Sequence, residues 1–360
     1  MQQNRAILIS GIALVALFSL TACGTSKTTT DDTESQADET TDIASSDVQD
    51  DATAAACNEQ PEGEVTLPLD EGVHDEDLEW WYWTGHLQAE DGRWFGFEQV
   101  FFLIKNGDMT FTMAHHAITD ANNQKFNYDV KFGMWNGETA ERGFAFAQGP
   151  LTALGYEGVD VLHGELDNST MDVELKAVKA PVLQHENGYH EYPFGGFTYY
   201  YSRERMEAAG TLVINGETIP VTGTAWFDHQ WGALGNATDA GWDWFALQLD
   251  DNREVMATVI HDAEGPLMYA GSITDEKCGT TDLQEEDIQI TPLGEWTSPT
   301  TGCTYPLGWD LKVGDLNLTV TPVMDDQEIA SPEKTYWEGA ATVSGDATGR
   351  AYIELVGYCP

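Results

Sequence analysis

The sequence predicts an all-β protein of the sandwich or barrel class. Short runs alternate between apolar and polar residues, and turn signals such as Asn-Gly and Asp-Gly separate them at even spacing. Long runs of Ala, Leu, Glu and Lys at helical spacing are absent from the body of the chain. Aromatic residues make up 11% of the sequence, and 35 residues are glycine. This composition favours strands joined by turns, and 360 residues are enough for two barrels in tandem.

Residues 1–22 are expected to be a lipoprotein signal peptide. Arg5 precedes a short apolar run, and a Leu-Thr-Ala-Cys sequence that ends at Cys23 follows it. This arrangement resembles a bacterial lipobox, so Cys23 would be lipidated and become the first residue of the mature protein. Gly24 rather than Asp follows the cysteine, which favours the outer membrane. We therefore expect the acyl chains to anchor the protein to the bacterial cell envelope, facing the periplasm.

Residues 23–60 are expected to be an acidic, disordered tether. Thr, Ser, Asp, Glu and Ala dominate this stretch, which has almost no large apolar residue to bury. Over the whole chain, 61 Asp and Glu oppose 16 Lys and Arg, which gives a formal net charge of −45. This balance repels nucleic acid and anionic lipid head groups, and it suits a salty or extracytoplasmic setting. Nucleic acid is therefore excluded as a partner, and contact with a membrane is expected through the lipid anchor.

Residues 61–233 are expected to form the first barrel domain, and residues 234–360 the second. A loop-rich stretch near residues 234–240 separates them. The strands expected in the first domain are 79–87, 93–104, 109–119, 143–146, 171–177, 196–203, 210–214 and 218–231. The strands expected in the second domain are 242–249, 254–260, 267–272, 309–313, 316–322, 336–343 and 350–358. Any helices should be short.

The body of the chain contains four cysteines, namely Cys57, Cys278, Cys303 and Cys359. In an exported protein they are expected to form two disulfides, for which three pairings exist. Cys278 and Cys303 flank one loop-rich segment and are natural partners. Cys57 and Cys359 would then tie the two ends of the folded body together. No C-x-x-C motif or neighbouring histidine supports a metal site at these cysteines.

The stretch 221–244 concentrates the polar and aromatic residues that could carry chemistry. If residues 222–231 are extended, their side chains alternate between two faces, so His229 and Trp231 share one face and Asp228 lies on the other. A histidine beside a tryptophan can orient a water molecule or a carbonyl group against an aromatic wall. We take His229, Trp231 and Asp228 as candidate catalytic residues, and we expect His229 and Trp231 to lie beside the strand that carries Trp242 and Trp244. The alternative is a satisfied polar pair inside a crowded barrel.

Several other enzyme patterns are absent from the sequence. It contains no G-x-S-x-G elbow, no H-E-x-x-H helix and no glycine-rich phosphate loop. Glu98 and Glu338 could form a glycosidase pair if the fold placed them at the required separation. The acidic run that begins at His74 could bind a cation, but we interpret it as a solvated turn. No metal and no cofactor are expected.

An excess of Trp and Tyr accompanies a few polar residues. Such a set can line a pocket for a long apolar ligand with few polar anchors, stack on sugar rings, or fill the core of wide barrels. The residues from which we expect ligand contacts are Trp81, Tyr82, Gln99, His116, Tyr200, Trp242, Asp243 and Trp244. His115 and His116 are neighbours in one strand, so at most one of them can face a shared interior.

Several long motifs resemble those of the AttH-like and carotenoid hydratase (CrtC) family. They are EWWY at 79–82, YYYSRERM at 199–206, VTGTAWFDHQWG at 221–232, YWEG at 336–339 and GY at 357–358, and the resemblance spans roughly residues 64–358. It implies two lipocalin-like β-barrel domains in tandem. The family also contains proteins described only as secreted hydrolases, so the resemblance leaves the activity open.

The resemblance has a specific implication for the site. In the hydratases of the family, water adds across a terminal double bond of a carotenoid precursor. His229 and Trp231 match the His-x-Trp part of the hydratase site. The acid of that site would fall in the strand at 253–260, where this chain has Met256 and Thr258. We therefore expect a lipid-anchored protein that binds an elongated apolar ligand, such as a lipid or an isoprenoid. The alternative is a hydratase-like or hydrolase-like enzyme acting on such a ligand.

Overall fold

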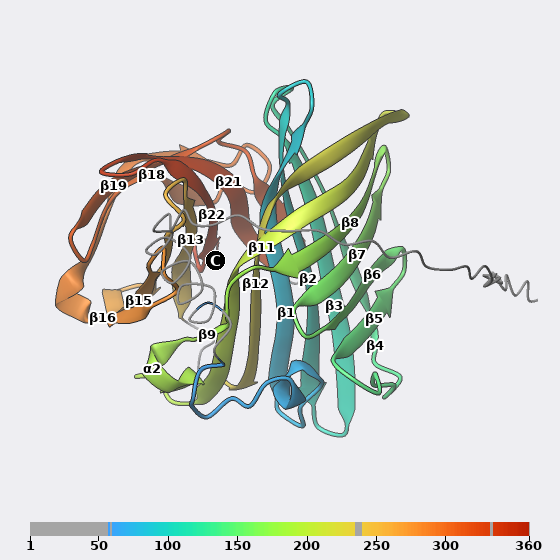
Figure 1. Ribbon diagram of the computed structural model, residues 1–360, viewed down its shortest axis with the longest axis horizontal. Helices are drawn as coiled ribbons and strands as arrows, with labels where there is room; N and C mark the ends of the chain where they lie inside the picture. Colours follow the sequence, from blue (N-terminus) through green and yellow to red (C-terminus); the bar gives the residue numbers. More distant parts are fainter. Residues whose placement is uncertain (1–56, 58–59, 235–239, 332–333, 360) are drawn as a thin grey trace, which may run out of the picture. The chain divides into compact units, whose positions relative to one another are not determined.

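The computed structural model describes residues 57, 60–234, 240–331 and 334–359. The predicted signal peptide, the lipidation site Cys23 and nearly all of the predicted tether lie outside the described residues. The described part of the chain forms two curled antiparallel sheets (Figure 1). The prediction of an all-β fold with two lipocalin-like barrels is confirmed.

In the first sheet, β1 pairs with β12, the last strand of that sheet. Its strands are β1 (Leu78–Ala89), β2 (Trp94–Asn106), β3 (Met109–Asp120), β4 (Lys125–Met134), β5 (Phe144–Gln148), β6 (Leu151–Tyr156), β7 (Val159–Leu166), β8 (Ser169–Ala177), β9 (Val182–Leu183), β10 (Tyr189–Glu191), β11 (Phe197–Ile214) and β12 (Glu217–Ala233). Their order is β4-β3-β2-β1-β12-β11-β8-β7-β6-β5, and β9 and β10 pair with β11. Because β1 and the last strand are neighbours, the sheet curls into a barrel whose two edges are β4 and β5.

The second sheet repeats this plan with β13 beside β22. Its strands are β13 (Gly241–Leu249), β14 (Glu254–Asp262), β15 (Gly265–Thr274), β16 (Thr280–Leu283), β17 (Ile288–Thr297), β18 (Thr304–Val313), β19 (Leu316–Pro322), β20 (Glu328–Ala330), β21 (Thr335–Gly345) and β22 (Gly349–Val356). Their order is β16-β15-β14-β13-β22-β21-β19-β18-β17, and β20 pairs with β21.

The helices in the described residues are short, as predicted. They are η1 (Leu69–Glu71), α2 (His185–Gly188) and η3 (Glu285–Asp287). None of the helices in the described ranges has the length and apolar character of a membrane-spanning helix.

Some strands were not predicted from the sequence, and one strand was predicted as two. β4, β6, β7 and β17 were not predicted, because large apolar residues lie on their exposed faces and conceal the alternation. These exposed residues include Phe132 in β4, Leu154 in β6, Val159 in β7 and Leu293 in β17. β11 is one strand of 18 residues rather than two, with a register shift between Arg203 and Met206. The Ala-Ala-Gly segment inside β11 has a low strand propensity, but pairing with β8 and β12 on its two sides holds it extended.

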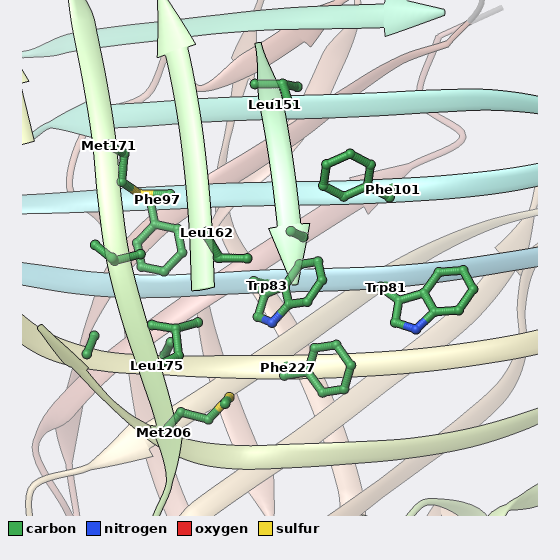
Figure 2. Close-up of a cluster of buried hydrophobic side chains, with 14 of the residues drawn as sticks. Trp81, Trp83, Phe97, Phe101, Leu151, Leu162, Met171, Leu175, Met206 and Phe227 are labelled. Carbon is green, nitrogen blue, oxygen red and sulfur yellow. The ribbon is translucent and has the colours of Figure 1, made fainter. Parts of the chain in front are cut away.

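The interior of the first barrel is filled by large side chains. Figure 2 shows aromatic rings of β1, β2 and β12 packed against aliphatic residues of β6, β7 and β8. The largest fully buried rings include Trp81, Trp83, Phe97 and Phe227. Each such ring removes about 150–250 Å² from water, so this cluster is a major source of stability.

A second aromatic cluster lies between the two sheets, and we call it the inter-sheet seam. The first sheet contributes Tyr82, Val100, Tyr200 and Trp226, and the second contributes Trp244, Ala246 and Met256. Hydrogen bonds also cross the seam. Examples are the one from Gln248 Nε2 to the carbonyl oxygen of Ala225 (2.9 Å) and the one between His86 Nε2 and the carbonyl oxygen of Ala351 (3.0 Å).

The four described cysteines form two disulfides, but the pairing favoured from the sequence is wrong. Cys57 is bonded to Cys278, and Cys303 is bonded to Cys359. Nearness along the chain was a poor guide, because β17 and the turn that follows it carry Cys303 away from Cys278. The Tyr305 hydroxyl group lies 3.4 Å from Cys359 Sγ, which shows how closely the C-terminal segment packs on the start of β18.

Candidate functional site

β12 carries two different sets of side chains on its two faces, as its alternation predicts. Ala225, Phe227 and Trp231 belong to the core of the first barrel, and His229 lies among them. Trp226 belongs to the seam. Asp228 also faces the seam, because its partners there are Tyr200, Ser202 and Trp226. The three candidate catalytic residues are therefore divided between two sites.

His229 lies at one end of the first barrel, in a group of two histidines and one glutamate. Its Nε2 atom is 2.8 Å from Glu79 Oε1, and Nδ1 of His74 is 2.7 Å from the same oxygen. The ring of Trp81 stacks on His229 with 4.4 Å between centroids. The ring of Trp231 stacks on His74 at 4.0 Å, with the two planes 1° apart. His74 is thus part of a partly buried site, although the sequence suggested a solvated turn.

The charges in this group follow from burial and hydrogen bonding. Burial lowers the pKa of His229 to about 4, although the hydrogen bond to Glu79 opposes this change. Burial alone would raise the pKa of Glu79, but the hydrogen bonds from His229 and His74 outweigh it and the pKa lies below its ordinary value. At neutral pH the group therefore contains an ionised carboxylate and a neutral His229.

The other predicted ligand contacts in the first barrel are buried in its packed interior. Gln99 Nε2 donates a hydrogen bond to the carbonyl oxygen of Thr152 (2.9 Å), and Nδ1 of His116 lies 3.1 Å from the carbonyl oxygen of Glu98. Two open depressions of about 300 and 540 Å³ lie at hairpin ends of this barrel, and neither includes a predicted site residue. Trp81, Gln99 and His116 therefore form part of a filled core in the structure described here.

Trp242 and Trp244 do not lie beside His229 and Trp231, so that expectation is wrong. Trp244 contacts Tyr82 and Trp226 across the seam, with ring centroids 5.5 and 6.0 Å apart. Its Nε1 donates to the Tyr200 hydroxyl group at 3.3 Å, and that hydroxyl group donates to Asp228 Oδ2 at 2.8 Å. The two tryptophans are separated from His229 because the second sheet packs against the outer face of β12, whereas His229 points from the inner face.

Asp243 is separate from both groups. It follows Trp242 in β13 and so lies on the opposite face, where it accepts a hydrogen bond from the Tyr358 hydroxyl group (2.8 Å) and lies 3.3 Å from His261 Nε2. Trp242 Nε1, in contrast, donates to Glu354 Oε2 on the seam side at 2.8 Å.

The seam also contains buried carboxyl groups. Glu98 and Glu338 are 0% exposed, and Glu354 is the direct cross-strand partner of Glu338. The Tyr82 hydroxyl group donates to Glu338 Oε1. Both oxygens of Glu98 and Oε2 of Glu338 find no hydrogen-bond partner within the described ranges. Glu98 and Glu338, the pair suggested by the sequence, therefore lie in one cluster.

The surroundings keep these carboxyl groups protonated. Burial raises the pKa of Glu98 and of Glu338 well above the ordinary value, and the charge of Glu354 adds to the effect in both. Burial also raises the pKa of Glu354 and of Asp228 to about 7. A neutral carboxylic acid inside an aromatic wall is a proton donor, so the seam can act as an acid.

His115 and Tyr336 complete the cluster, and the sequence analysis assigned no role to either. His115 Nδ1 lies 2.6 Å from the Tyr336 hydroxyl group, and its Nε2 has no hydrogen-bond partner among the described residues. Burial lowers the pKa of His115 to about 3, so its ring is neutral. The sequence held one signal for this cluster. Alternation along β2 and β3 places Glu98 and His115 on the faces opposite to Gln99 and His116.

The fold and its buried seam define a protein with two lipocalin-like β-barrels in tandem. The chain belongs to the AttH-like family, whose model matches residues 58–358. It is similar to a candidate AttH protein of Nitrosomonas europaea, with 30% identity and a TM-score of 0.76 over 83% of this chain and 98% of that one. The resemblance noted in the motifs is thereby confirmed.

Two further crystal structures show the same fold at lower identity. Kievitone hydratase from Nectria haematococca is 19% identical, with a TM-score of 0.66 over 83% of this chain and 96% of that one. CghA with Sch210972 is 10% identical, with a TM-score of 0.51 over 78% of this chain and 88% of that one. No curated protein matches the sequence.

Proposed function

We propose that this protein is a lipid-anchored envelope enzyme that binds an elongated apolar molecule, such as a lipid or an isoprenoid, and adds water across one of its double bonds. The observation that carries the proposal is the pair Glu98 and Glu338, which are fully buried and have three of their four carboxyl oxygens without a partner among the described residues. Burying such groups is costly unless they stay protonated, and this protonation makes them proton donors.

Hydration of a double bond requires an acid, a shelter for the carbocation and a placed water molecule. Glu98 is the acid, because neither of its oxygens is engaged. The faces of Tyr82, Trp226 and Trp244 surround the seam and can stabilise a positive charge. The proton passes from Glu98 to one alkene carbon, and the oxygen of water bonds to the other carbon. His115 Nε2 then accepts the proton that the water releases.

The partly buried rings at the edge of the seam mark where an apolar ligand would enter. Trp80, Phe102 and Trp242 pack against the buried cluster and remain partly accessible to solvent. An elongated chain that displaces contacts between these rings would place its double bond near Glu98. The similarity to kievitone hydratase shows the fold alone, but the name of that protein indicates the reaction class to test first.

Binding without turnover is the second candidate, and one observation favours it. Where the resemblance to the carotenoid hydratases places the acid, this chain has Met256 packed in the seam and Thr258 two residues later. If the buried carboxyl groups serve only to hold the two sheets together, the seam binds a ligand and leaves it unchanged.

We expect Glu98→Gln to reduce hydration by roughly 10²-fold or more while ligand affinity stays within a few-fold, because only the proton donor is lost. To measure this, isoprenoids and unsaturated lipids are incubated with the protein in D₂O, and the deuterated alcohol is followed by mass spectrometry. Glu217→Gln, an exposed glutamate of the first sheet, is the matched control and should leave the rate unchanged. Wild-type binding without any deuterated product would favour the second candidate, and full activity of Glu98→Gln would remove the carboxyl cluster from the mechanism.

The lipid anchor, which lies outside the described residues, has its own prediction. Cys23→Ala should release the protein from membranes or leave the precursor uncleaved, because the acylated thiol is the only attachment proposed. Fractionation of the cell envelope followed by intact mass of the membrane-bound form measures this. A Cys23→Ala variant that still fractionates with the outer membrane like the wild type would contradict the anchor.

A further inference from the structure

The group of His74, Glu79 and His229 is not used by the proposed reaction. The ring nitrogens of both histidines lie within 2.8 Å of one carboxylate oxygen, and the ligand atoms of the three residues all lie within 4.8 Å of one another. Two neutral imidazole nitrogens and a carboxylate oxygen are the donor set of three-ligand transition-metal sites. We propose that these three residues bind one divalent transition-metal ion, with Zn²⁺ as the representative ion.

The neighbouring side chains hold the donors in a fixed orientation. Trp231 stacks on the ring of His74 and Trp81 stacks on the ring of His229, so neither ring turns freely. The second oxygen of Glu79 accepts a hydrogen bond from the backbone nitrogen of His74 at 2.9 Å. Metal sites use such outer contacts to orient their ligands, and preorganised donors lose little entropy when an ion binds.

The charge of the group also favours a cation. Glu79 is 1% exposed, and its salt-bridge partners in the described part of the chain are the two histidines alone. The buried guanidinium group of Arg203 is paired with Glu71 instead. A buried carboxylate without a Lys or Arg partner is costly, and a divalent ion supplies the missing positive charge. The Nδ1 atom of His229 is likewise buried without a described partner.

The position of the group allows an ion to enter and leaves it incompletely coordinated. The side chain of His74 is 21% exposed, whereas His229 is fully buried, so the site opens toward solvent at His74. Metal–ligand bonds of about 2.1 Å in a tetrahedral site separate the donors by roughly 3.3 Å. The donors must therefore move apart by about half an ångström, and His74 can move because it precedes β1. A three-ligand site keeps a position for water or a substrate.

The sulfur-containing group of Cys303, Glu328 and Cys359 is a different case. Its two sulfur atoms form a disulfide and are therefore not thiolate ligands. The histidine site is also distinct from the carboxyl cluster, because His229 and Asp228 point to opposite faces of β12. Loss of metal binding and loss of hydration can therefore be separated by experiment.

The test uses the full-length protein in detergent, purified without a histidine tag and treated with a chelator. Zn²⁺ binding is measured by calorimetry in excess Ca²⁺, which occupies weak sites on a chain with a net charge of −45. We expect one equivalent of Zn²⁺, and His74→Ala and Glu79→Gln should each weaken its affinity at least 100-fold. The matched control is His163→Ala, since His163 lies between Glu165 and Asp172 on the surface and should not affect the stoichiometric site.

Co²⁺ provides an independent readout of the ligands. Its visible absorption should report nitrogen and oxygen coordination in the wild type and should be lost in His74→Ala. The His74 ring is partly exposed, so its removal should not prevent folding. Absence of a stoichiometric site, or equal Zn²⁺ affinity in the wild type and His74→Ala, would overturn the proposal. If Glu79→Gln does not fold, the Zn²⁺ affinity of His74→Ala alone tests the proposal.

Discussion

Raising the pH from 6.5 to 9 should lower the free energy of unfolding by several kcal/mol. The cause is a set of buried carboxyl groups whose pKa is raised in the folded protein. Burial raises the pKa of Glu204 to about 8 and that of Asp228 and Glu354 to about 7, and it raises the pKa of Glu98 and Glu338 well above the ordinary value. In the unfolded chain these groups ionise near pH 4. Between those values the folded state holds more protons than the unfolded state, so stability falls as the pH rises.

The window above pH 6.5 isolates this effect from the histidines. Burial lowers the pKa of His86 and His115 to about 3 and that of His116 and His229 to about 4. Since free histidine titrates near 6.5, these groups make stability rise with pH below that value and contribute no slope above it. The slope of stability with pH above 6.5 therefore reports the buried carboxyl groups, without a contribution from these histidines.

Each carboxyl group that stays protonated contributes a slope of at most about 1.4 kcal/mol per pH unit. Glu98→Gln cannot ionise, so its alkaline slope should be smaller by up to that amount and its stability at pH 9 should exceed that of the wild type. Glu217→Gln, at the surface, should reproduce the wild-type curve. Urea denaturation at a series of pH values gives these slopes. A flat wild-type profile between pH 6.5 and 9 would show that the buried carboxyl groups are not protonated.

The stretch 222–231 shows how far the sequence could predict this structure. Period-2 alternation in residues 222–231 correctly placed His229 and Trp231 on one face and Asp228 on the other, because the side-chain direction in a strand is local geometry. It could not say which face meets the second sheet. The assumption that His229 and Trp231 face the Trp242 strand was therefore wrong, although each strand was predicted correctly.

The features of the site that the sequence could not predict depend on contacts between distant segments. Glu79 and His229 are 150 residues apart, and only the β1–β12 pairing makes Trp81 the cross-strand partner of His229. Glu98 and Glu338 likewise meet because β2 and β21 pack across the seam. Alternation predicts strands, but it contains no information about the packing of one sheet on another. The motifs of the AttH-like family supplied the tandem-barrel plan that alternation alone left open.

Glu254→Ala should destabilise the protein by about 3–5 kcal/mol, because it leaves a buried ammonium group without its partner. Glu254 is 0% exposed at the start of β14 in the second sheet. Lys179 lies between β8 and β9 of the first sheet, and its Nζ is 2.6 Å from Glu254 Oε2. Arg205 donates from Nε to the other oxygen. Removal of the carboxylate therefore leaves two cations facing each other between the sheets.

The matched comparison is Glu217→Ala, which removes the same negative charge from the exposed ion pair with Arg93. That pair has an Nη2–Oε1 distance of 2.6 Å, but Glu217 is 59% exposed, so its loss should cost less than about 1 kcal/mol. Both variants change the net charge equally, so the difference reports burial alone. The double variant Lys179→Met/Glu254→Gln should recover part of the loss, because it removes the stranded ammonium group. If denaturant unfolding gives equal stabilities for Glu254→Ala and Glu217→Ala, this buried salt bridge does not hold the two sheets together.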